Sequence, residues 1–391
     1  MIDSIYLDNQ ATTPTDPRVR EAMLPLLALD NVGNPHSEHF AGRKASNVVE
    51  KARREIAELI GARPQEIIFT SGATEANNIA LQGIARANMR RGRHIITSAT
   101  EHKCVLQTLR MLENIGFLID VLPVGRNGLI DLDQLSETIT DKTTLVSVMT
   151  ANNEIGVLQP IEKIAEICQS RDVVFHSDAA QAAGKIQIDV KASGIDLMSL
   201  SGHKMYAPIG IGALYVSDEC PVLPEPLFGG GGQERGMRPG TLAPVLCTAM
   251  GAACYIAMNE IENDAKSSLA HRHRFLEIFK SFVPDVRVNC EDSPRLPGNL
   301  SLTLPDIDAD RLVGTVQPQV MISTNAACSS GMVHPSHVLL ALGLNEIDAA
   351  STIRVSFGRF NTAAEIESAA RCIGSAAARI RSARSDSVAA Q

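Results

Sequence analysis

The chain has 391 residues, a formal net charge of −8, and 45% hydrophobic and 20% charged residues. This length exceeds the size at which one hydrophobic core usually keeps growing, so we expect two domains. The acidic balance provides no overall attraction to nucleic acid or to an anionic membrane, and neither is an expected partner. We find no apolar stretch that approaches the length of a membrane span and no signal peptide, and we therefore expect a cytoplasmic protein.

The eight cysteines show neither a C-x-x-C pair nor the spacing of a zinc site. We therefore expect no metal site. Most of the cysteines should be small buried hydrophobic residues that remain reduced in the cytosol.

The first 216 residues predict an α/β fold. A short strand at 5–8 and helices beginning at Asp16-Pro17 and covering 41–60 precede a regular alternation of strands and helices. The predicted strands cover residues 67–70, 94–98, 117–124, 145–150, 173–178, 197–201 and 212–216. Their continuous apolar runs indicate a sheet with helices on both faces. In such folds ligands bind beyond the carboxyl ends of the strands.

The rest of the chain predicts a smaller α+β segment, which a helix over 246–282 enters. Strands are expected at 286–289, 299–304, 320–324 and 352–356, and helices at 309–316, 336–342 and 363–380. The Ala/Ser/Arg-rich tail that follows should fray.

Lys204 directly follows the apolar strand 197–201, after Ser201, Gly202 and His203. A lysine at this place is poorly solvated, and a desolvated amine loses its proton readily, so it can hold an aldehyde cofactor as a Schiff base. Taken alone, a lysine in a turn is more often a solvated surface residue.

Asp178 ends the strand 173–178, and Gln181 follows three residues later. A carboxylate at the end of a buried strand is costly without a cationic partner, and a protonated pyridine nitrogen would be such a partner. The alternative is an aspartate that caps the next helix. Asp178 and Lys204 together fit pyridoxal phosphate far better than either residue does singly.

Three further loops follow predicted strands. The segment from Ser71 to Thr74 could hold an anion with free N–H groups, a helix dipole and a hydroxyl, or its Ser71 or Thr74 could simply cap the helix. His102 could lie flat on an aromatic ring and transfer protons, although a single histidine is more often structural. The amide of Asn153 could donate to a ring oxygen.

Taken together, these motifs resemble the cysteine desulfurases. The resemblance rests on Leu7-Asp8, Ala11-Thr12-Thr13-Pro14, Ser71-Gly72-Ala73-Thr74-Glu75, Thr100-Glu101-His102-Lys103, Asn152-Asn153-Glu154-Ile155-Gly156, Asp178-Ala179-Ala180-Gln181, Ser201-Gly202-His203-Lys204, the stretch 229–241 and Thr352-Ile353-Arg354-Val355-Ser356. These enzymes are fold-type-I pyridoxal-phosphate enzymes of the class V aminotransferase family, and the likeness is closest to the branch that serves iron–sulfur assembly. It covers nearly the whole chain.

The resemblance implies a large domain over 16–258, with a mostly parallel seven-stranded sheet between helices. It also implies a small α+β domain formed by 1–15 and 259–391, and a homodimer.

The resemblance also implies a role for each motif residue. Lys204 would carry pyridoxal 5'-phosphate, Asp178 would pair its ring nitrogen, His102 would stack on the ring, and Gln181 and Asn153 would approach its phenolic oxygen. The phosphate would be held by Ala73, Thr74, Ser201 and His203, joined by Thr241 of the second subunit. Arg354 would bind the substrate carboxylate together with Asn153. Without the resemblance, a structural arginine would be the slightly favoured interpretation of this residue.

Cys328 lies in the loop 325–335, which is small, polar and almost without apolar anchors, as a mobile segment should be. An exposed, reactive cysteine is expected there, and the family places its sulfur-accepting nucleophile at this position. The flanking residues Thr324 to Ala327 and Val333 to Pro335 depart from the Ser-Gly-Ser and Leu-Glu-Pro that the family commonly has. These departures put the identity of the sulfur acceptor in doubt.

The expected reaction converts L-cysteine to L-alanine and leaves the sulfur on Cys328 as a persulfide. An acceptor protein would then take the sulfur toward iron–sulfur assembly, tRNA thiolation or DNA phosphorothioate modification. One alternative is a selenocysteine lyase or another β-eliminating enzyme of this fold. The other is a scaffold of this fold that only binds sulfur-carrier partners.

Overall fold

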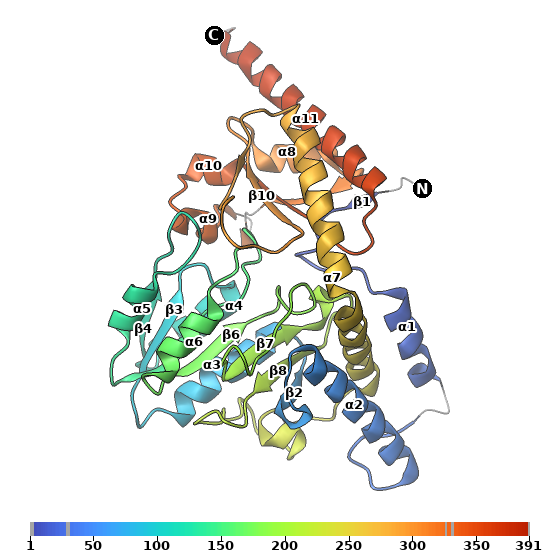
Figure 1. Cartoon of the computed structure of the whole chain (residues 1–391), viewed down its shortest axis with the longest axis vertical. Helices are drawn as coiled ribbons and strands as arrows, with labels where there is room; N and C mark the ends of the chain where they lie inside the picture. Colours follow the sequence, from blue (N-terminus) through green and yellow to red (C-terminus); the bar gives the residue numbers. More distant parts are fainter. Residues whose placement is uncertain (1–3, 29–31, 325–326, 330–331, 390–391) are drawn as a thin grey trace.

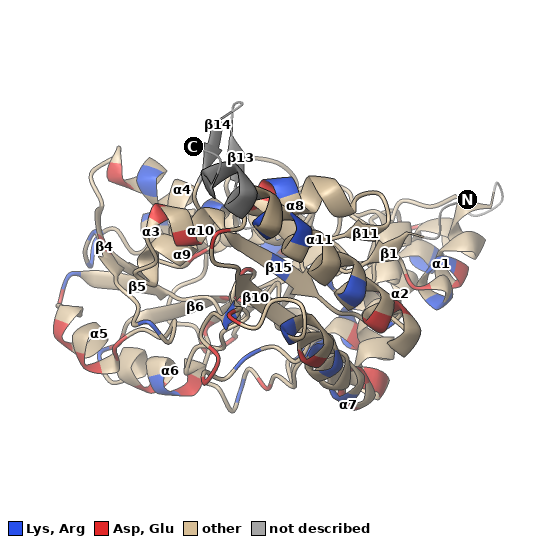
Figure 2. Ribbon diagram, turned by 90° about the horizontal axis from the view of Figure 1, so that it is seen from above, with Lys and Arg blue, Asp and Glu red and all other residues tan. Residues whose placement is uncertain are grey.

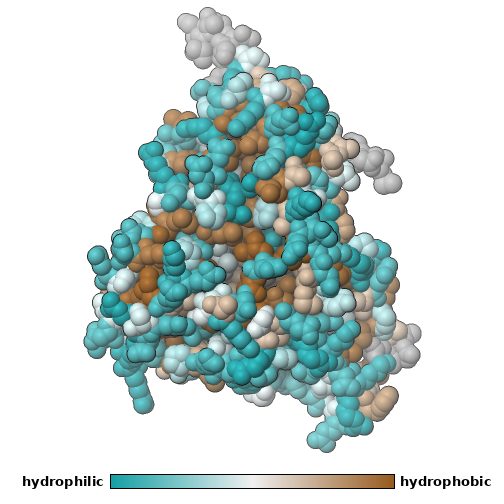
Figure 3. Space-filling view, viewed as in Figure 1, coloured by the Kyte–Doolittle hydropathy of each residue, from teal (hydrophilic) through white to brown (hydrophobic). Residues whose placement is uncertain are grey.

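The computed structural model describes residues 4–28, 32–324, 327–329 and 332–389, without the side chains of 327–329, 332–334 and 384–389. Figure 1 shows a larger lower part built around one sheet and a smaller upper part, with the long helix α7 (Pro244–Lys280) running through both. Hydrophilic residues cover most of the face in Figure 3, and apolar ones gather near its mid-height. In Figure 2 acidic and basic residues are interspersed along the outer helices.

The large sheet has seven strands, as predicted. They are β2 (Ile67–Thr70), β3 (His94–Ser98), β4 (Leu118–Leu122), β5 (Thr143–Ser147), β6 (Val174–Asp178), β7 (Leu197–Ser201) and β8 (Gly212–Val216), in the order β2-β8-β7-β6-β5-β3-β4. Strand β8 is antiparallel to both of its neighbours, and all other neighbouring strands are parallel. The mostly parallel sheet is therefore confirmed.

The two faces of this sheet face two separate hydrophobic cores, which explains the continuous apolar runs. Ile96 and Phe175 pack into a core with α2 (Phe40–Leu59), α6 (Ile161–Gln169) and α7, whereas their neighbours Ile95 and Val174 pack into one with α3 (Ala73–Ala87) and α4 (Lys103–Glu113). Successive strand residues point to opposite faces, so both must be apolar. The edge strand β4 is the exception, because Leu118 is 61% exposed.

The smaller part contains the antiparallel sheet β12-β15-β10-β9, formed by Ser323–Thr324, Thr352–Ser356, Asn299–Thr303 and Arg287–Val288. Beside it β1 (Ile5–Tyr6) pairs in parallel with β11 (Val320–Met321), so the start of the chain joins its last third. Its helices are α8 (Ala309–Val316), α9 (His337–Ala341), α10 (Glu346–Ala350) and α11 (Ala363–Ala389). The short helix α10 was not predicted.

The remaining elements are short. Helix α1 (Pro17–Met23) begins where expected, with the Asp16 side chain accepting from Arg18 N as its N-cap. Helix α5 (Leu132–Thr138) follows β4, and single 3₁₀ turns lie at η1 (Leu24–Leu27), η2 (Pro64–Glu66), η3 (Gly202–Lys204) and η4 (Gln233–Gly236).

Two predictions for the C-terminal third are wrong. The stretch predicted as a loop over 325–335 contains two paired strands, β13 (Ala327–Ser329) and β14 (Met332–His334), in which Cys328 is opposite Val333. The tail predicted to fray instead continues α11 through Ala389, because alanine and arginine are strong helix formers.

Helix α7 also corrects the expectation about membrane spans, since it is long and apolar enough to cross a membrane by length and composition. Half of its most apolar window is buried inside the protein, and it packs against α1, α2 and α11. A helix that packs in a protein core can be as long and as apolar as a membrane span, so length and composition alone do not distinguish the two.

Candidate active site

A cavity of about 460 Å³ opens at the carboxyl ends of β6 and β7, next to the N-terminus of α3. Its walls include Ala73, Thr74, His102, Asn153, Asp178, Gln181, Ser201, His203, Lys204 and Arg354. The structure thus brings together all of the predicted site residues whose side chains it describes, except Thr241.

Lys204 ends the short turn η3 that follows β7, and its ammonium group lies against the first loop of the chain. Its Nζ donates to Gln10 O at 2.7 Å and to Ala11 O at 2.6 Å. Burial, followed by the positive charge of Arg354, lowers the pKa of this amine to about 8. A substantial fraction of the amine is therefore neutral near neutral pH, as a nucleophilic lysine requires.

Asp178 is 4% exposed at the end of β6. Its Oδ2 accepts from Asn77 Nδ2 at 2.7 Å, and its Oδ1 accepts from Ala180 N at 2.9 Å. Asn77 belongs to α3, so this helix positions both the carboxylate and the loop beside it. The carboxylate lines the cavity with these neutral partners, which leaves it suited to a cationic ring nitrogen.

The start of α3 has no side-chain cap. The N-cap residue is Gly72, and neither Ser71 nor Thr74 caps the helix with its side chain. The first N–H groups of α3 consequently face the cavity with the positive end of the helix dipole behind them. Glu75 accepts from Ser71 N and pairs with Arg238 at 3.0 Å, which ties this loop to the glycine-rich stretch 229–241.

His102 forms the N-cap of α4, and its Nδ1 accepts from Cys104 N at 3.2 Å. The same ring nitrogen lies 3.0 Å from Cys104 Sγ. Desolvation lowers the pKa of the imidazole, and Asp178 opposes this effect. Because Nδ1 accepts, the proton of the neutral ring lies on Nε2.

His203 and Ser201 complete the cavity floor at the end of β7. His203 Nδ1 lies 3.1 Å from Thr12 Oγ1, and its carbonyl accepts from both the N–H and the hydroxyl of Thr13. Burial, with Lys204 and Lys185 nearby, lowers the pKa of His203 to about 4. This histidine is therefore neutral and can serve as a hydrogen-bonding partner for an anion.

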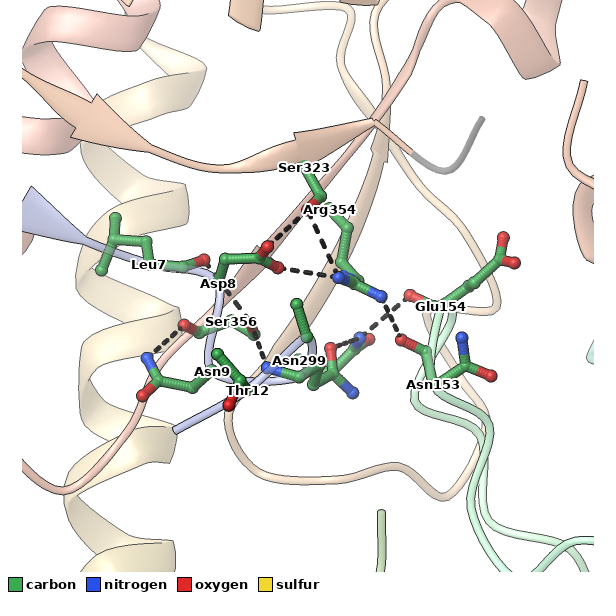
Figure 4. Close-up of polar contacts among 12 residues, drawn as sticks. Leu7, Asp8, Asn9, Thr12, Asn153, Glu154, Asn299, Ser323, Arg354 and Ser356 are labelled. Carbon is green, nitrogen blue, oxygen red and sulfur yellow. Dashed lines mark hydrogen bonds and ion pairs between the residues drawn. The ribbon is translucent and has the colours of Figure 1, made fainter. Parts of the chain in front are cut away.

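Arg354 extends from β15 toward the cavity, between the first loop and the Asn153 loop (Figure 4). Its Nη2 pairs with Asp8 Oδ1 at 2.7 Å, and its Nη1 donates to Asn153 O at 2.8 Å. Ser323 Oγ donates to the second oxygen of Asp8 at 2.6 Å. Among the described residues the buried Nε of Arg354 has no hydrogen-bond partner. The guanidinium is thus held in place by Asp8 and the Asn153 carbonyl.

One predicted residue, Thr241, is exposed and is not among the residues that line this cavity. The side chain of Cys328 lies outside the described residues. Four of the other seven cysteines are buried and all seven are free, as expected.

Sequence reasoning missed the groups that hold the site residues in place. Asn77 binds Asp178, Asp8 binds Arg354, and the carbonyls of Gln10 and Ala11 bind Lys204. The first loop, which follows β1, entered the sequence analysis only as motifs of the resemblance. This loop contacts Lys204 and Arg354, which lie 194 and 346 residues further along the chain. No local pattern in the sequence could indicate such contacts.

The residues present fit pyridoxal phosphate. An amine of lowered pKa, a buried carboxylate that forms no ion pair with any described residue, and a helix N-terminus without a side-chain cap lie on one cavity. These groups match the aldehyde, the ring nitrogen and the phosphate of the cofactor. Within the described part of the chain, no group of three or more His, Cys, Asp or Glu residues could hold a metal ion.

Residues 5–368 match the model of the family described as Aminotransferase class-V. The chain is 50% identical over 371 residues to a protein named mitochondrial cysteine desulfurase from Drosophila melanogaster, covering 94% of this chain and 80% of the relative. It is 48% identical over 382 residues to cysteine desulfurase IscS of Rickettsia bellii, covering 97% and 93%. A solved NifS-like protein superimposes with a TM-score of 0.88 at 34% identity, over 95% of this chain and 98% of that one. The chain therefore belongs to the class V aminotransferase family and, within it, to the pyridoxal-phosphate-dependent cysteine desulfurases.

Proposed function

We propose that this protein converts L-cysteine to L-alanine and receives the sulfur on Cys328 as a persulfide, which it passes to an acceptor protein. The observation that carries the proposal is the convergence of Lys204, Asp178 and Arg354 on one cavity. These three side chains can hold an aldehyde cofactor, its ring nitrogen and an amino acid carboxylate.

Bound pyridoxal phosphate would supply an electron sink for negative charge at the substrate α-carbon. Lys204 would hold the cofactor and then move the proton at that carbon, since its amine titrates near neutral pH. Asp178 would keep the ring nitrogen charged, while Gln181 and Asn153 would contact the phenolic oxygen. His102 would lie against the ring with its Nε2 proton available.

Ala73 and Thr74 at the start of α3, with Ser201 and His203, would bind the phosphate. The N–H groups of the helix start and the neutral His203 support this role. Arg354 would bind the substrate carboxylate with the free edge of its guanidinium, aided by Asn153. Asp8 and the Asn153 carbonyl fix the plane of that guanidinium, so the substrate would be oriented as well as attracted.

In the sulfur-transfer step the thiolate of Cys328 would attack the substrate sulfur. A sulfur–sulfur bond forms and the bond between that sulfur and the β-carbon breaks, with its electron pair going to the substrate. Protonation of the substrate carbon then yields alanine. A selenocysteine lyase or a β-eliminating relative would remain active without Cys328, and a scaffold protein would show no turnover.

We further propose that the protein is a homodimer whose sites are completed by Thr241 of the second subunit. The exposure of Thr241 and its absence from the lining of its own cavity support this arrangement. We also propose the domain division into 16–258 and 1–15 with 259–391. Separate cores, one around Phe175 and one around Phe275, are consistent with it.

The pathway and the location are proposals as well. The relatives' names include a bacterial IscS and a mitochondrial enzyme. We propose a cytoplasmic enzyme that supplies iron–sulfur assembly, with tRNA thiolation and DNA phosphorothioate modification as the other candidates. Fractionation of cells and identification of the proteins that co-purify with this chain test both points.

The central test uses the purified protein with bound cofactor. Borohydride should fix the cofactor to Lys204, which mass spectrometry of the digested protein locates. Lys204→Ala should carry no reducible covalent cofactor, and Asp178→Ala should retain some cofactor but form almost no alanine from cysteine. Full covalent occupancy in Lys204→Ala would refute the assignment.

A further inference from the structure

Lys185 is a mostly buried lysine just behind the active site, and its partner is neutral. Its Nζ donates to Gln181 Oε1 at 2.9 Å. Within the described residues it forms no ion pair, and the charges that act on it most, those of Lys204 and Arg354, are positive. Burial and these two charges lower its pKa to about 7. Burying an amine without a carboxylate partner costs folding free energy, which suggests that this lysine has a functional role.

Lys185 does not line the cofactor cavity. It lines a separate small cavity of about 40 Å³, together with Asn9, Tyr206 and Asp264. Gln181 lines the large cavity, and Gln10 lines both. Lys185 can therefore act on the cofactor through the residues that separate the two cavities or through its charge.

The connecting contacts form a chain of hydrogen bonds that leaves only one orientation for the Gln181 amide. Lys185 donates to the amide oxygen, which therefore faces the amine. Gln10 O can only accept, so the amide nitrogen must face Gln10, and it donates at 2.8 Å. The same Gln10 carbonyl also accepts from Lys204 Nζ at 2.7 Å. The second N–H of Gln181 remains for the cofactor cavity.

We infer that Lys185 is a positioning residue, which holds the Gln181 amide with its NH₂ group toward the cofactor and its oxygen away from it. The inference rests on the proposed function, in which Gln181 faces the phenolic oxygen of pyridoxal phosphate. Without Lys185 only the bond to Gln10 O holds the amide, so its plane can turn and its second N–H can point away from the phenolic oxygen. Lys185 would thus contribute to the electronic state of the cofactor without touching it.

The amine, rather than the bulk of the side chain, is what this role requires. Methionine has a similar volume and fills the same space without a buried amine. A purely structural lysine would lower the stability of the protein when replaced. A positioning lysine should leave the stability of the cofactor-free protein unchanged or higher while impairing the site.

The test is a double-mutant cycle on the holoenzyme with Lys185→Met, Gln181→Ala and the double variant. The readout is the pH titration of the visible absorption band of bound pyridoxal phosphate, with alanine formation measured in parallel. Loss of an N–H donor to the phenolic oxygen makes the cofactor–lysine linkage more basic, so its pKa should rise by about one unit in each single variant. The double variant should show no further rise, because both substitutions remove the same contact.

Lys163→Met, on the exposed face of α6, is the matched control and should titrate as the wild type does. A double variant in which the two shifts add would overturn the inference, since Lys185 would then act by its charge alone. The inference would also be contradicted if Lys185→Met left the pKa of the cofactor–lysine linkage unchanged and made the cofactor-free protein less stable. If Lys185→Met does not fold, Lys185→Gln, which is too short to reach Gln181, must show the same shift. A colourless, inactive wild type would refute the proposed function instead.

Discussion

At the scale of single residues, the surroundings of the Lys204 amine determine its chemistry by lowering its pKa. Its pKa is lowered from 10.5 to about 8 by burial and by Arg354. Only the neutral amine can attack an aldehyde, and the neutral fraction grows as the pH rises through the pKa. The rate at which cofactor-free protein captures pyridoxal phosphate should therefore rise with pH and reach half of its maximum near pH 8.

Stopped-flow absorbance at a fixed cofactor concentration measures this rate. An unperturbed lysine would reach its half-maximum more than two pH units higher, and such a result would contradict the assigned environment. Replacing Arg354 with methionine removes one of the two causes, so the midpoint should then move upward.

Cys328 provides a second test at this scale. Cys328→Ser should fold, bind the cofactor and bind cysteine, because the substitution is nearly isosteric. Alanine and persulfide formation should fall by several orders of magnitude, since a hydroxyl is hardly ionised near neutral pH and attacks sulfur poorly. Single-turnover alanine assays and mass spectrometry of the added sulfur are the measurements. Cys372→Ser, a half-buried site in α11, is the control, and normal turnover by Cys328→Ser would mean that another nucleophile acts.

At the scale of elements, a buried ion pair attaches the glycine-rich stretch to β2. Arg53 of α2 makes two hydrogen bonds to Glu234, at 2.7 and 2.9 Å, and Glu234 accepts from Phe69 N at 2.6 Å. The side chains are 11% and 3% exposed. Arg53→Met should cost about 3 kcal/mol of unfolding free energy, because it leaves a buried carboxylate unpaired.

Urea unfolding at one protein concentration measures this loss. Lys51→Met on the same helix, whose side chain is 72% exposed, should change stability by less than about 0.5 kcal/mol. Adding Glu234→Gln to Arg53→Met should restore part of the stability, since the glutamine oxygen still accepts from Phe69 N. A loss below about 1 kcal/mol in Arg53→Met would show that the pair is not needed.

Elements with a strong local signal were predictable from the sequence. The bounds of β2, β3, β7 and β8 are as predicted, because strands buried on both faces are continuously apolar and end at polar turns. The five-residue helix α10 and the pairing of β13 with β14 were missed, since each is too short to show a period. Most cavity residues were predictable because they end or follow a strand, whereas Arg354 lies within β15 and was assigned through the resemblance. Their partners Asn77 and Asp8 were not, because those contacts depend on packing between distant segments.

At the scale of the whole molecule, the proposed dimer makes a test by complementation possible. Lys204→Ala should be inactive for lack of the cofactor link, and Thr241→Glu should be nearly inactive because it brings a carboxylate to the phosphate of the other subunit. A mixed dimer contains one site with both native residues, so co-expression should restore activity that neither variant has alone. Sedimentation establishes that the mixed species is a dimer. A monomeric holoenzyme with full activity would rule out composite sites.

The contact between Asp8 and Arg354 joins residues 346 positions apart, and Lys204 lies against carbonyls from the same first loop. During synthesis on the ribosome these groups cannot meet until β15 has emerged, long after the lysine and the first loop have been made. A truncated or stalled chain thus contains the nucleophilic amine but not the arginine that would orient an amino acid. Chains that are cut short would therefore be unable to release sulfur from cysteine, and only a finished polypeptide acquires that capacity.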